Sequence, residues 1–186
     1  METKIRILRQ AEHVFDEHGF AASGVDRVTD AAGVSTRTLY KHVGSKSALI
    51  EAVLSERQAR FFASVNGSSL DELFDSLETW MVNEGARGCF FLRAEGENAG
   101  QISEITNAVD EYHRLLRDLI DRIVSNELHA SDPMLSDQIL ILFEGATSAA
   151  TYRGASVVRT ASAAASALLQ ARILEMFDHS DDRKRS

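Results

Sequence analysis

The sequence has little of the residues that interrupt helices or cross-link chains. Its 186 residues include one Cys, one Pro and one Trp. A single cysteine excludes an intrachain disulfide framework and a cysteine-based zinc cluster, and a single proline leaves long helices uninterrupted. No apolar run reaches the length of a membrane span, and the first residues, METKIRILRQ, lack the apolar core of a signal peptide. We therefore expect a cytoplasmic protein without a membrane partner.

The composition is ordinary for a globular protein, with 44% hydrophobic and 26% charged residues. The net charge of −8 is unevenly distributed. Residues 1–60 contain nine Lys or Arg and eight Asp or Glu, whereas the remainder contains eleven and twenty. Residues 31–50 contain three basic side chains and no acidic one. Positive charge suited to DNA is thus confined to the N-terminal end of the chain. For the acidic residues of 61–186, a merely solubilising role is the preferred interpretation.

Helical periodicity recurs along the whole chain, and no strand-like alternation or internal repeat accompanies it. Apolar spacing predicts helices over residues 3–18, 25–32, 36–42, 46–63, 70–84, 105–128, 135–152 and 161–177, with a further short one after Gly88. We expect an all-α protein with an N-terminal three-helix domain over 1–55. A larger helical domain would span 56–180, and a charged, disordered tail would span 181–186.

Residues 25–49, VDRVTDAAGVSTRTLYKHVGSKSAL, predict two short helices joined by a tight turn. Gly33 supplies the positive φ that ends the first helix, and Ser35 is a good N-cap for the second. In the second helix Leu39 and Val43 point inward, which leaves hydrogen-bond donors and an aromatic ring outside. This arrangement is typical of the helix-turn-helix, whose second helix enters the DNA major groove.

The run AAGVSTRTLYKHVGSKSAL, together with apolar residues upstream such as Phe15 and Phe20, resembles the DNA-binding region of the TetR/AcrR family of transcriptional regulators. The resemblance covers Met1 to roughly Phe62, about a third of the chain. Four residues depart from the usual pattern without breaking it: Gly24, Arg27, Thr29 and Val43. The resemblance implies that the rest of the chain forms an all-helical ligand-binding and dimerisation domain.

The expected partner of this region is double-stranded DNA. Side chains with donors and fixed positive charge suit a groove lined by phosphates. Arg37 is open to two roles, pairing with a guanine edge or contacting a phosphate alone. Arg27 and Thr29 are possible additional contacts, and His42 is open between a phosphate contact and a half-buried structural role. The predicted DNA-binding residues are Arg27, Thr36, Arg37, Thr38, Tyr40, Lys41, His42 and Lys46.

The last two predicted helices carry small and apolar residues on more than one side, as in ILILFEGATSAA at 139–150. Such surfaces must be buried inside the monomer or against a partner. The resemblance implies a homodimer formed through these helices, which would require a palindromic operator. The predicted interface residues, with the exact face left open, are Leu140, Phe143, Glu144, Thr147, Leu168, Leu169, Arg172 and Ile173.

The resemblance also implies a pocket for an unknown small-molecule ligand among the helices of the second domain. An ordinary core role is the more common one for each aromatic candidate, and the mixed charges nearby leave the charge of the ligand open. A small, mostly apolar compound is the default for a helical pocket. The predicted pocket residues are Trp80, Phe90, Phe91, Tyr112, His113, Phe143 and Tyr152, and the polar candidates are Arg93, Glu95, Glu97, Asn98 and Arg153.

These patterns predict a homodimeric repressor that a small-molecule ligand releases from a palindromic operator. A transcriptional activator of the same fold is the alternative. We expect no cofactor and no metal site, because the six His are scattered without ligand spacing. An enzyme using Cys89 is a further alternative, against which the chain offers no GxSxG and no phosphate loop, and the neighbouring Phe90 and Phe91 favour a buried, inert thiol.

Overall fold

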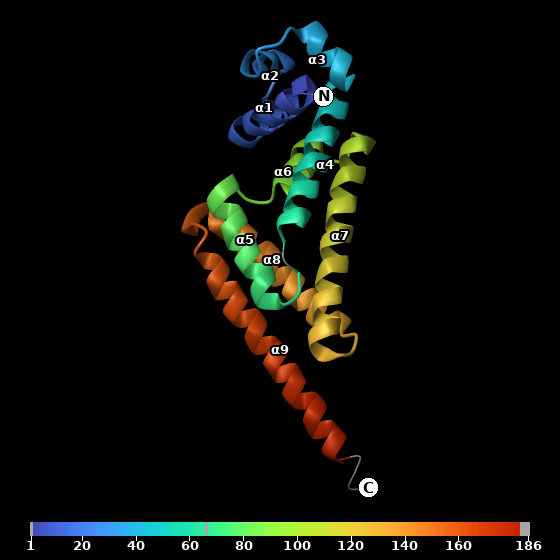
Figure 1. Cartoon of the computed structure of the whole chain (residues 1–186), viewed down its shortest axis with the longest axis vertical. Coiled ribbons are helices and arrows are strands. Elements are labelled where there is room, and N and C mark those ends of the chain that lie inside the picture. The colour runs from blue at the N-terminus through green and yellow to red at the C-terminus, as the bar shows by residue number, and fades with distance from the viewer. Residues whose placement is uncertain (1, 66, 183–186) are drawn as a thin grey trace. The chain divides into compact units, whose positions relative to one another are not determined.

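The computed structural model describes residues 2–65 and 67–182, with only the backbone for 178–182. Figure 1 shows the helices of these residues. They are α1 (Glu2–His18), α2 (Val25–Ala32), α3 (Thr36–Val43), α4 (Lys46–Ser64), α5 (Leu70–Glu84), α6 (Phe90–Asn98), α7 (Ser103–Leu128), α8 (Pro133–Arg153) and α9 (Val157–Asp182). The predicted all-α fold is confirmed. Among the described residues, no helix is both long and apolar enough to cross a membrane.

The chain divides into two compact units, and each unit combines two separate stretches of the sequence. The first comprises Met1–Ala63 and Cys89–Arg114, and the second comprises Ser64–Gly88 and Leu115–Ser186. Helix α6 therefore belongs with the N-terminal helices, and the boundary falls inside α7. The predicted division into 1–55 and 56–180 stays a prediction. Of the predicted tail, residues 181 and 182 end α9, and 183–186 lie outside the described residues.

The core of the first unit is built from the apolar faces of its helices. Ile7, Phe15, Leu39 and Leu49 are each completely buried. The ring of Phe20 lies 5.2 Å from that of Phe15 and 4.8 Å from that of Phe90, measured between centroids. Because Phe90 begins α6, this helix packs into the same core as α1.

A carboxylate of α1 joins that helix to α4 in the first unit. Glu12 accepts hydrogen bonds from Arg57 and from Arg60, each at 2.6 Å. The guanidinium of Arg57 also lies over the ring of Phe90, 4.6 Å from its centroid, and only 7% of the residue is exposed. A cation in such a place is tolerated because it is paired, so Glu12 fixes how α1 lies on α4.

Two side chains of α6 hold the end of α1. Arg93 donates to the Asp16 carboxylate at 2.9 Å and to the carbonyls of Phe15 and Asp16. Glu97 accepts from the backbone N–H of Ala21 at 2.7 Å. Arg93 and Glu97, which the sequence offered as polar ligand contacts, are thus engaged with backbone and side chain at the C-terminal end of α1.

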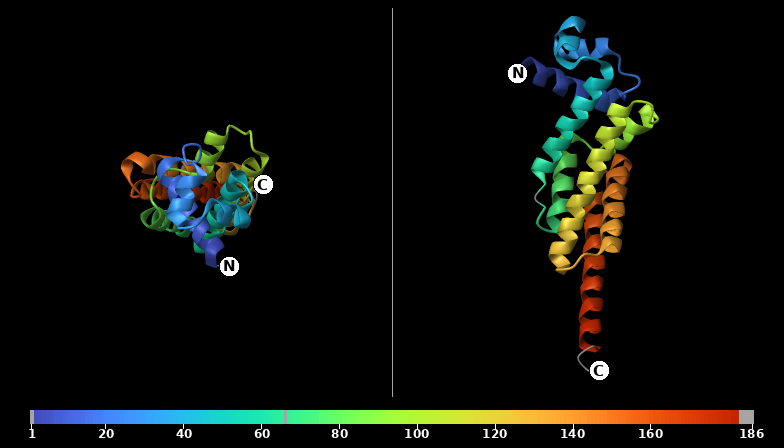
Figure 2. Two further views of the ribbon diagram at one scale, coloured as in Figure 1. Left: turned by 90° about the horizontal axis from the view of Figure 1, so that it is seen from above. Right: turned by 90° about the vertical axis from the view of Figure 1, so that its right-hand side faces the viewer.

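The second unit packs α5, α8 and α9 together with the second half of α7. Figure 2 shows α8 and α9 side by side, and α5 also packs on α9. Leu73 and Phe74 of α5 are buried with Ile139 and Phe143 of α8, and the rings of Phe74 and Phe143 lie 6.2 Å apart. Small residues such as Ala161 and Ala165 are buried on α9, which allows close helix packing.

The start of α8 is fixed by Asp132, which is 8% exposed. One carboxylate oxygen accepts from the Leu135 N–H at 3.0 Å, the geometry of a helix N-cap, and the other accepts from Arg172 of α9. These hydrogen bonds, that from Leu135 first, hold the pKa of Asp132 below its ordinary value. Asp132 thereby joins the first turn of α8 to α9.

Glu144 of α8 is a half-buried carboxylate in the second unit. Its Oε1 atom is inaccessible to solvent and has no hydrogen-bond partner among the described residues. Burial raises the pKa of Glu144 above its ordinary value of 4.5, because the charged form loses hydration. A raised pKa in the folded chain means that this group favours folding at low pH and loses that contribution as pH rises through the folded-state pKa.

Glu144→Gln is expected to stabilise the chain at neutral pH by about 1 kcal/mol, because the amide carries no charge to desolvate. The gain should grow over the pH range above 4.5, the ordinary pKa of this carboxyl, as the wild-type Glu144 ionises. Urea unfolding across that range measures it. Glu111→Gln, at an exposed carboxylate paired with Arg114, is the control and should show no such gain. A gain that is equal at both ends of the pH range would contradict this account of Glu144.

Candidate nucleic-acid interface

The turn between α2 and α3 has the geometry that the sequence predicts. Gly33 lies at φ 61° and ψ 42°, the left-handed region that favours glycine, and the Val34 N–H closes the turn on the Thr29 carbonyl at 3.0 Å. Ser35 Oγ then accepts from the Thr38 N–H at 3.1 Å and caps α3. The two hydroxyls of Ser35 and Thr38 also lie 2.8 Å apart.

Helix α3 presents one apolar and one polar face. Leu39 is completely buried and Val43 is 9% exposed, so both point inward as predicted. On the other side, Thr36, Arg37, Tyr40 and Lys41 are exposed, whereas Thr38 and His42 are half-buried. A helix with this exposed face offers two fixed cations and several donors to a groove lined by phosphates.

The flanking residues divide between exposed and buried positions. Arg27 is exposed on α2, and Lys46 is half-buried in the first turn of α4, where Ser45 Oγ accepts from the Ala48 N–H at 3.0 Å. Thr29 is 5% exposed and its hydroxyl donates to the Asp26 carbonyl at 2.8 Å. The suggestion that Thr29 contacts DNA is therefore wrong, because its only polar group is buried and used within α2.

Helix α1 adds exposed basic residues that the sequence reasoning passed over. Lys4, Arg6 and Arg9 are all exposed and belong to the same unit as α3. The available signal was three basic side chains in the first turns of the chain, against the single acid Glu2. The positive charge of this unit is thus carried by α1 as well as by the helix-turn-helix.

The predicted pocket residues are divided between the two units: Phe90, Phe91, Tyr112 and His113 belong to the first, and Trp80, Phe143 and Tyr152 belong to the second. In the first unit, Phe91 stacks on Tyr112 with centroids 3.8 Å apart and an angle of 4° between the rings. Burial lowers the pKa of the neighbouring His113, with Asp110 and Glu95 opposing that shift. In the second unit, Phe143 is a core residue. Tyr152 is 78% exposed, which does not support a place in an enclosed pocket wall.

The predicted dimer residues differ in how far their own unit covers them, and five are half-buried: Leu140, Glu144, Thr147, Leu168 and Ile173. Phe143 and Leu169 are buried, and Arg172 pairs with Asp132 and Glu175 of its own chain. These side chains are therefore engaged without a second chain. The sequence could not choose between the two faces, since both are apolar or small. The large apolar residues that α8 and α9 leave exposed are Met134, Ile141, Tyr152, Leu174, Met176 and Phe177.

Comparison with known proteins bears on the helix-turn-helix first. Residues 7–53 match the family model described as "Bacterial regulatory proteins, tetR family". The HTH-type transcriptional regulator UidR of Escherichia coli (strain K12) is 38% identical over 61 residues, 33% of this chain and 31% of UidR. The chain thus spans about a third of the length of UidR.

Two similarities extend over most of the chain. The A-factor receptor protein of Streptomyces griseus is 26% identical over 183 residues, which are 96% of this chain and 62% of that protein. The crystal structure of SCO4454, a TetR-family transcriptional regulator from Streptomyces coelicolor, superposes with a TM-score of 0.80. It covers 92% of this chain and 96% of SCO4454 at 23% identity, which shows a shared fold.

Ser35→Ala is expected to destabilise the chain by about 1 kcal/mol, because the Thr38 N–H loses the side chain that caps α3. Urea unfolding followed by circular dichroism measures the loss. Ser35→Asp is the matched variant, since a carboxylate caps equally well and should keep most of the stability. Equal losses in both variants would show that the cap is not what Ser35 contributes.

Proposed function

We propose that the chain is a TetR-family regulator, because residues 7–53 match the model of that family, and that it is a homodimeric repressor that a small-molecule ligand releases from a palindromic operator. The observation that carries the proposal is the exposed polar face of α3, held outward by the buried Leu39. TetR-family regulators bind DNA and are not enzymes, so Cys89 has no catalytic role in this proposal. A regulator of this kind acts on DNA in the cytoplasm.

Base recognition is assigned to α3 in the major groove. Arg37 is exposed in its first turn, where a guanidinium can form two hydrogen bonds to a guanine edge. Lys41 on α3 and Lys46 at the start of α4 are assigned to phosphates, and the free N–H groups of the first turn of α4 favour an anion at the same place. The exposed Lys4, Arg6 and Arg9 of α1 add charge that does not depend on the DNA sequence.

The homodimer would form through the exposed faces of α8 and α9. On α8, Ile141 and Tyr152 lie eleven residues apart and so share one side of the helix, and both are exposed. On α9, Leu174 and Phe177 are 65% and 67% exposed. The small residues Ala163 and Ala167, also exposed on that side, permit close approach of a second helix. Two copies of α3 in such a dimer would read successive major grooves about 34–36 Å apart.

Release by ligand requires a path from the ligand to the DNA-reading helices. Helix α6 is suited to this, because Arg93 and Glu97 hold the end of α1 within the first unit. A ligand that prefers one position of α6 would shift the population of DNA-binding states by its difference in affinity between them. The A-factor receptor protein, similar over most of the chain, is a receptor by name, which supports a ligand-responsive role.

The proposal is tested by selecting bound fragments from sheared genomic DNA with purified protein. We expect enrichment of a palindrome whose affinity falls steeply as salt rises. A reporter driven from that palindrome then separates repression from activation, the alternative for this fold. Failure to enrich any sequence, with protein refolded to remove bound ligand, would contradict the proposal.

Arg37→Ala should weaken binding to the selected palindrome by about 1–3 kcal/mol and relax the preference at one base position. Lys41→Ala should weaken binding to all sequences alike and reduce the slope of log affinity against log salt by about one contact. Arg122→Ala, at an exposed residue of the second unit, is the control and should leave both quantities unchanged. Fluorescence anisotropy at several salt concentrations measures them.

The double variant Ile141→Asp/Leu174→Asp is expected to convert the dimer to a monomer, because it places two charges in each copy of an apolar interface. Sedimentation velocity over a range of protein concentrations measures the change. Val82→Asp is the control, since Val82 is 70% exposed on α5 and should leave the dimer intact. A dimer that persists in the double variant would assign dimerisation to another face.

A further inference from the structure

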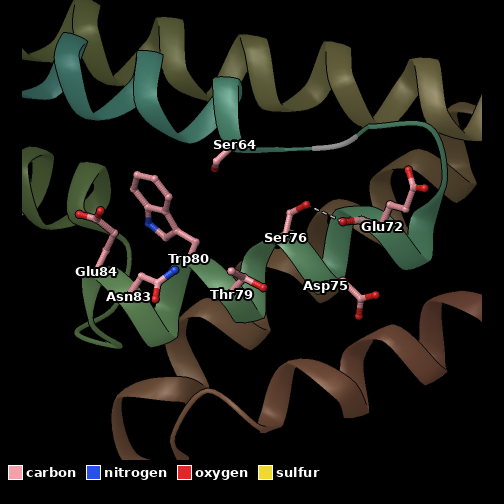
Figure 3. A pocket seen from close by; sticks show the side chains of 8 residues that line it. All are labelled: Ser64, Glu72, Asp75, Ser76, Thr79, Trp80, Asn83 and Glu84. Atoms are coloured by element: carbon pink, nitrogen blue, oxygen red, sulfur yellow. Dashed lines mark hydrogen bonds between the residues drawn. The ribbon is translucent and has the colours of Figure 1, made fainter.

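A cavity of about 440 Å³ lies along one side of α5 in the second unit (Figure 3). The lining residues from α5 recur every three or four positions, so they share one side of that helix. Ser64, the last residue of α4 and the first of the second unit, completes the lining. The lining residues are Ser64, Glu72, Asp75, Ser76, Thr79, Trp80, Asn83 and Glu84.

The cavity lining is polar and negatively charged. It consists of three carboxylates, three hydroxyls, one amide and one indole, and among the described residues that line it none is Lys, Arg or His. Ionised carboxylates only accept hydrogen bonds, and the hydroxyl of Ser68 already donates to Glu72. The potential there attracts a cation and repels a carboxylate or a phosphate.

Trp80 gives the cavity an aromatic surface. It is the only tryptophan of the chain and is half-buried. Figure 3 shows its indole extending from α5 on the side where Ser64 lies. The opposite side of α5 supplies the core residues Leu73 and Leu77, so the ring lies on the polar side of an amphipathic helix. The face of an indole attracts ammonium groups, and it also contacts the apolar part of an organic molecule.

We propose that this cavity binds a small organic cation. Its cationic group would lie beside Trp80 and Glu84, which are four residues apart on the same side of α5. The carboxylates of Glu72 and Asp75 lie farther along the helix and would add negative potential. A volume of about 440 Å³ accommodates a small organic molecule rather than an ion alone. This chemistry differs from the mostly apolar ligand that is the default for a helical pocket. The assignment of this cation as the effector rests on the proposed function, whereas its binding to the cavity does not.

The experiment uses the fluorescence of the whole protein, because its single tryptophan lines the cavity. Excitation at about 295 nm selects the indole over tyrosine, and benzyltrimethylammonium chloride is the cationic probe. Benzyl alcohol and sodium benzoate are the neutral and anionic counterparts, and magnesium chloride tests for a simple metal site. We expect a saturable change in Trp80 emission with benzyltrimethylammonium alone.

Matched variants then assign the binding to the carboxylates. Asp75→Asn/Glu84→Gln removes two charges with little change of shape and should weaken the apparent Kd for benzyltrimethylammonium at least about tenfold. Glu78→Gln is the control, because Glu78 lies on α5 outside the cavity lining and pairs with Arg159 at 3.4 Å. This control should bind within about twofold of the wild type. Far-UV circular dichroism confirms that each variant is folded.

Four outcomes would overturn the site: no saturable change with the cation, an equal change with benzyl alcohol or benzoate, the same change with magnesium alone, or unweakened binding by the double variant. The titration uses protein without DNA, so it tests whether the cavity binds the cation even if no operator is found. Operator affinity measured with and without the probe tests whether the bound cation is the effector. A probe that binds without altering operator affinity leaves the site intact and removes its role as effector.

Discussion

The orientation of α3 is the constraint on which the DNA-reading surface depends. Eight residues are too few to form a stable helix in water by themselves. Burial of Leu39 and Val43 supplies what the short helix lacks, and the Ser35 cap fixes where it begins. Every exposed donor on α3 inherits its direction from these contacts. The polar face of α3 is therefore a consequence of core packing. Its own side chains contribute little to the stability of the fold.

The first unit extends this constraint beyond the helix-turn-helix. Glu12 positions α1 on α4 through two arginines, and Arg93 and Glu97 attach α6 to the end of α1. The hydrogen bonds of Glu12 and Arg93 are charge-assisted and partly buried, where they are stronger than on an open surface, whereas that of Glu97 is exposed. A displacement of α6 therefore cannot leave the end of α1 untouched. For the ligand response proposed above, this connection lies inside one compact unit.

The second unit combines two surfaces of opposite chemistry. The outer sides of α8 and α9 carry exposed apolar residues such as Ile141 and Phe177, which suit burial against a second copy. The side of α5 that lines the cavity carries carboxylates and one indole instead. Separate helices thus provide an apolar surface for association and a charged one for a small ligand, so a change at either site need not alter the other.

Local sequence determined the helices and the chemistry of α3, while the tertiary structure decided which side chains stayed available. Gly33, Ser35 and the spacing of Leu39 and Val43 predicted the turn, the cap and the inward face, because those features depend on residues only a few positions apart. Thr29 was misjudged because its burial depends on neighbouring helices. Arg93 likewise gained its partner from α1, and Glu97 from Ala21 just after α1, each more than seventy residues earlier.

The same division explains the two surfaces of the second unit. On α8 and α9, apolar and small residues surround the helix, so periodicity could not tell the inner from the outer side, and only packing against α5 and α7 buried Phe143 and left Ile141 exposed. The polar stripe of α5 was readable as helical spacing from the sequence. Its cavity was not, because helical spacing does not show where the end of α4 lies against α5 or which space between them stays unfilled.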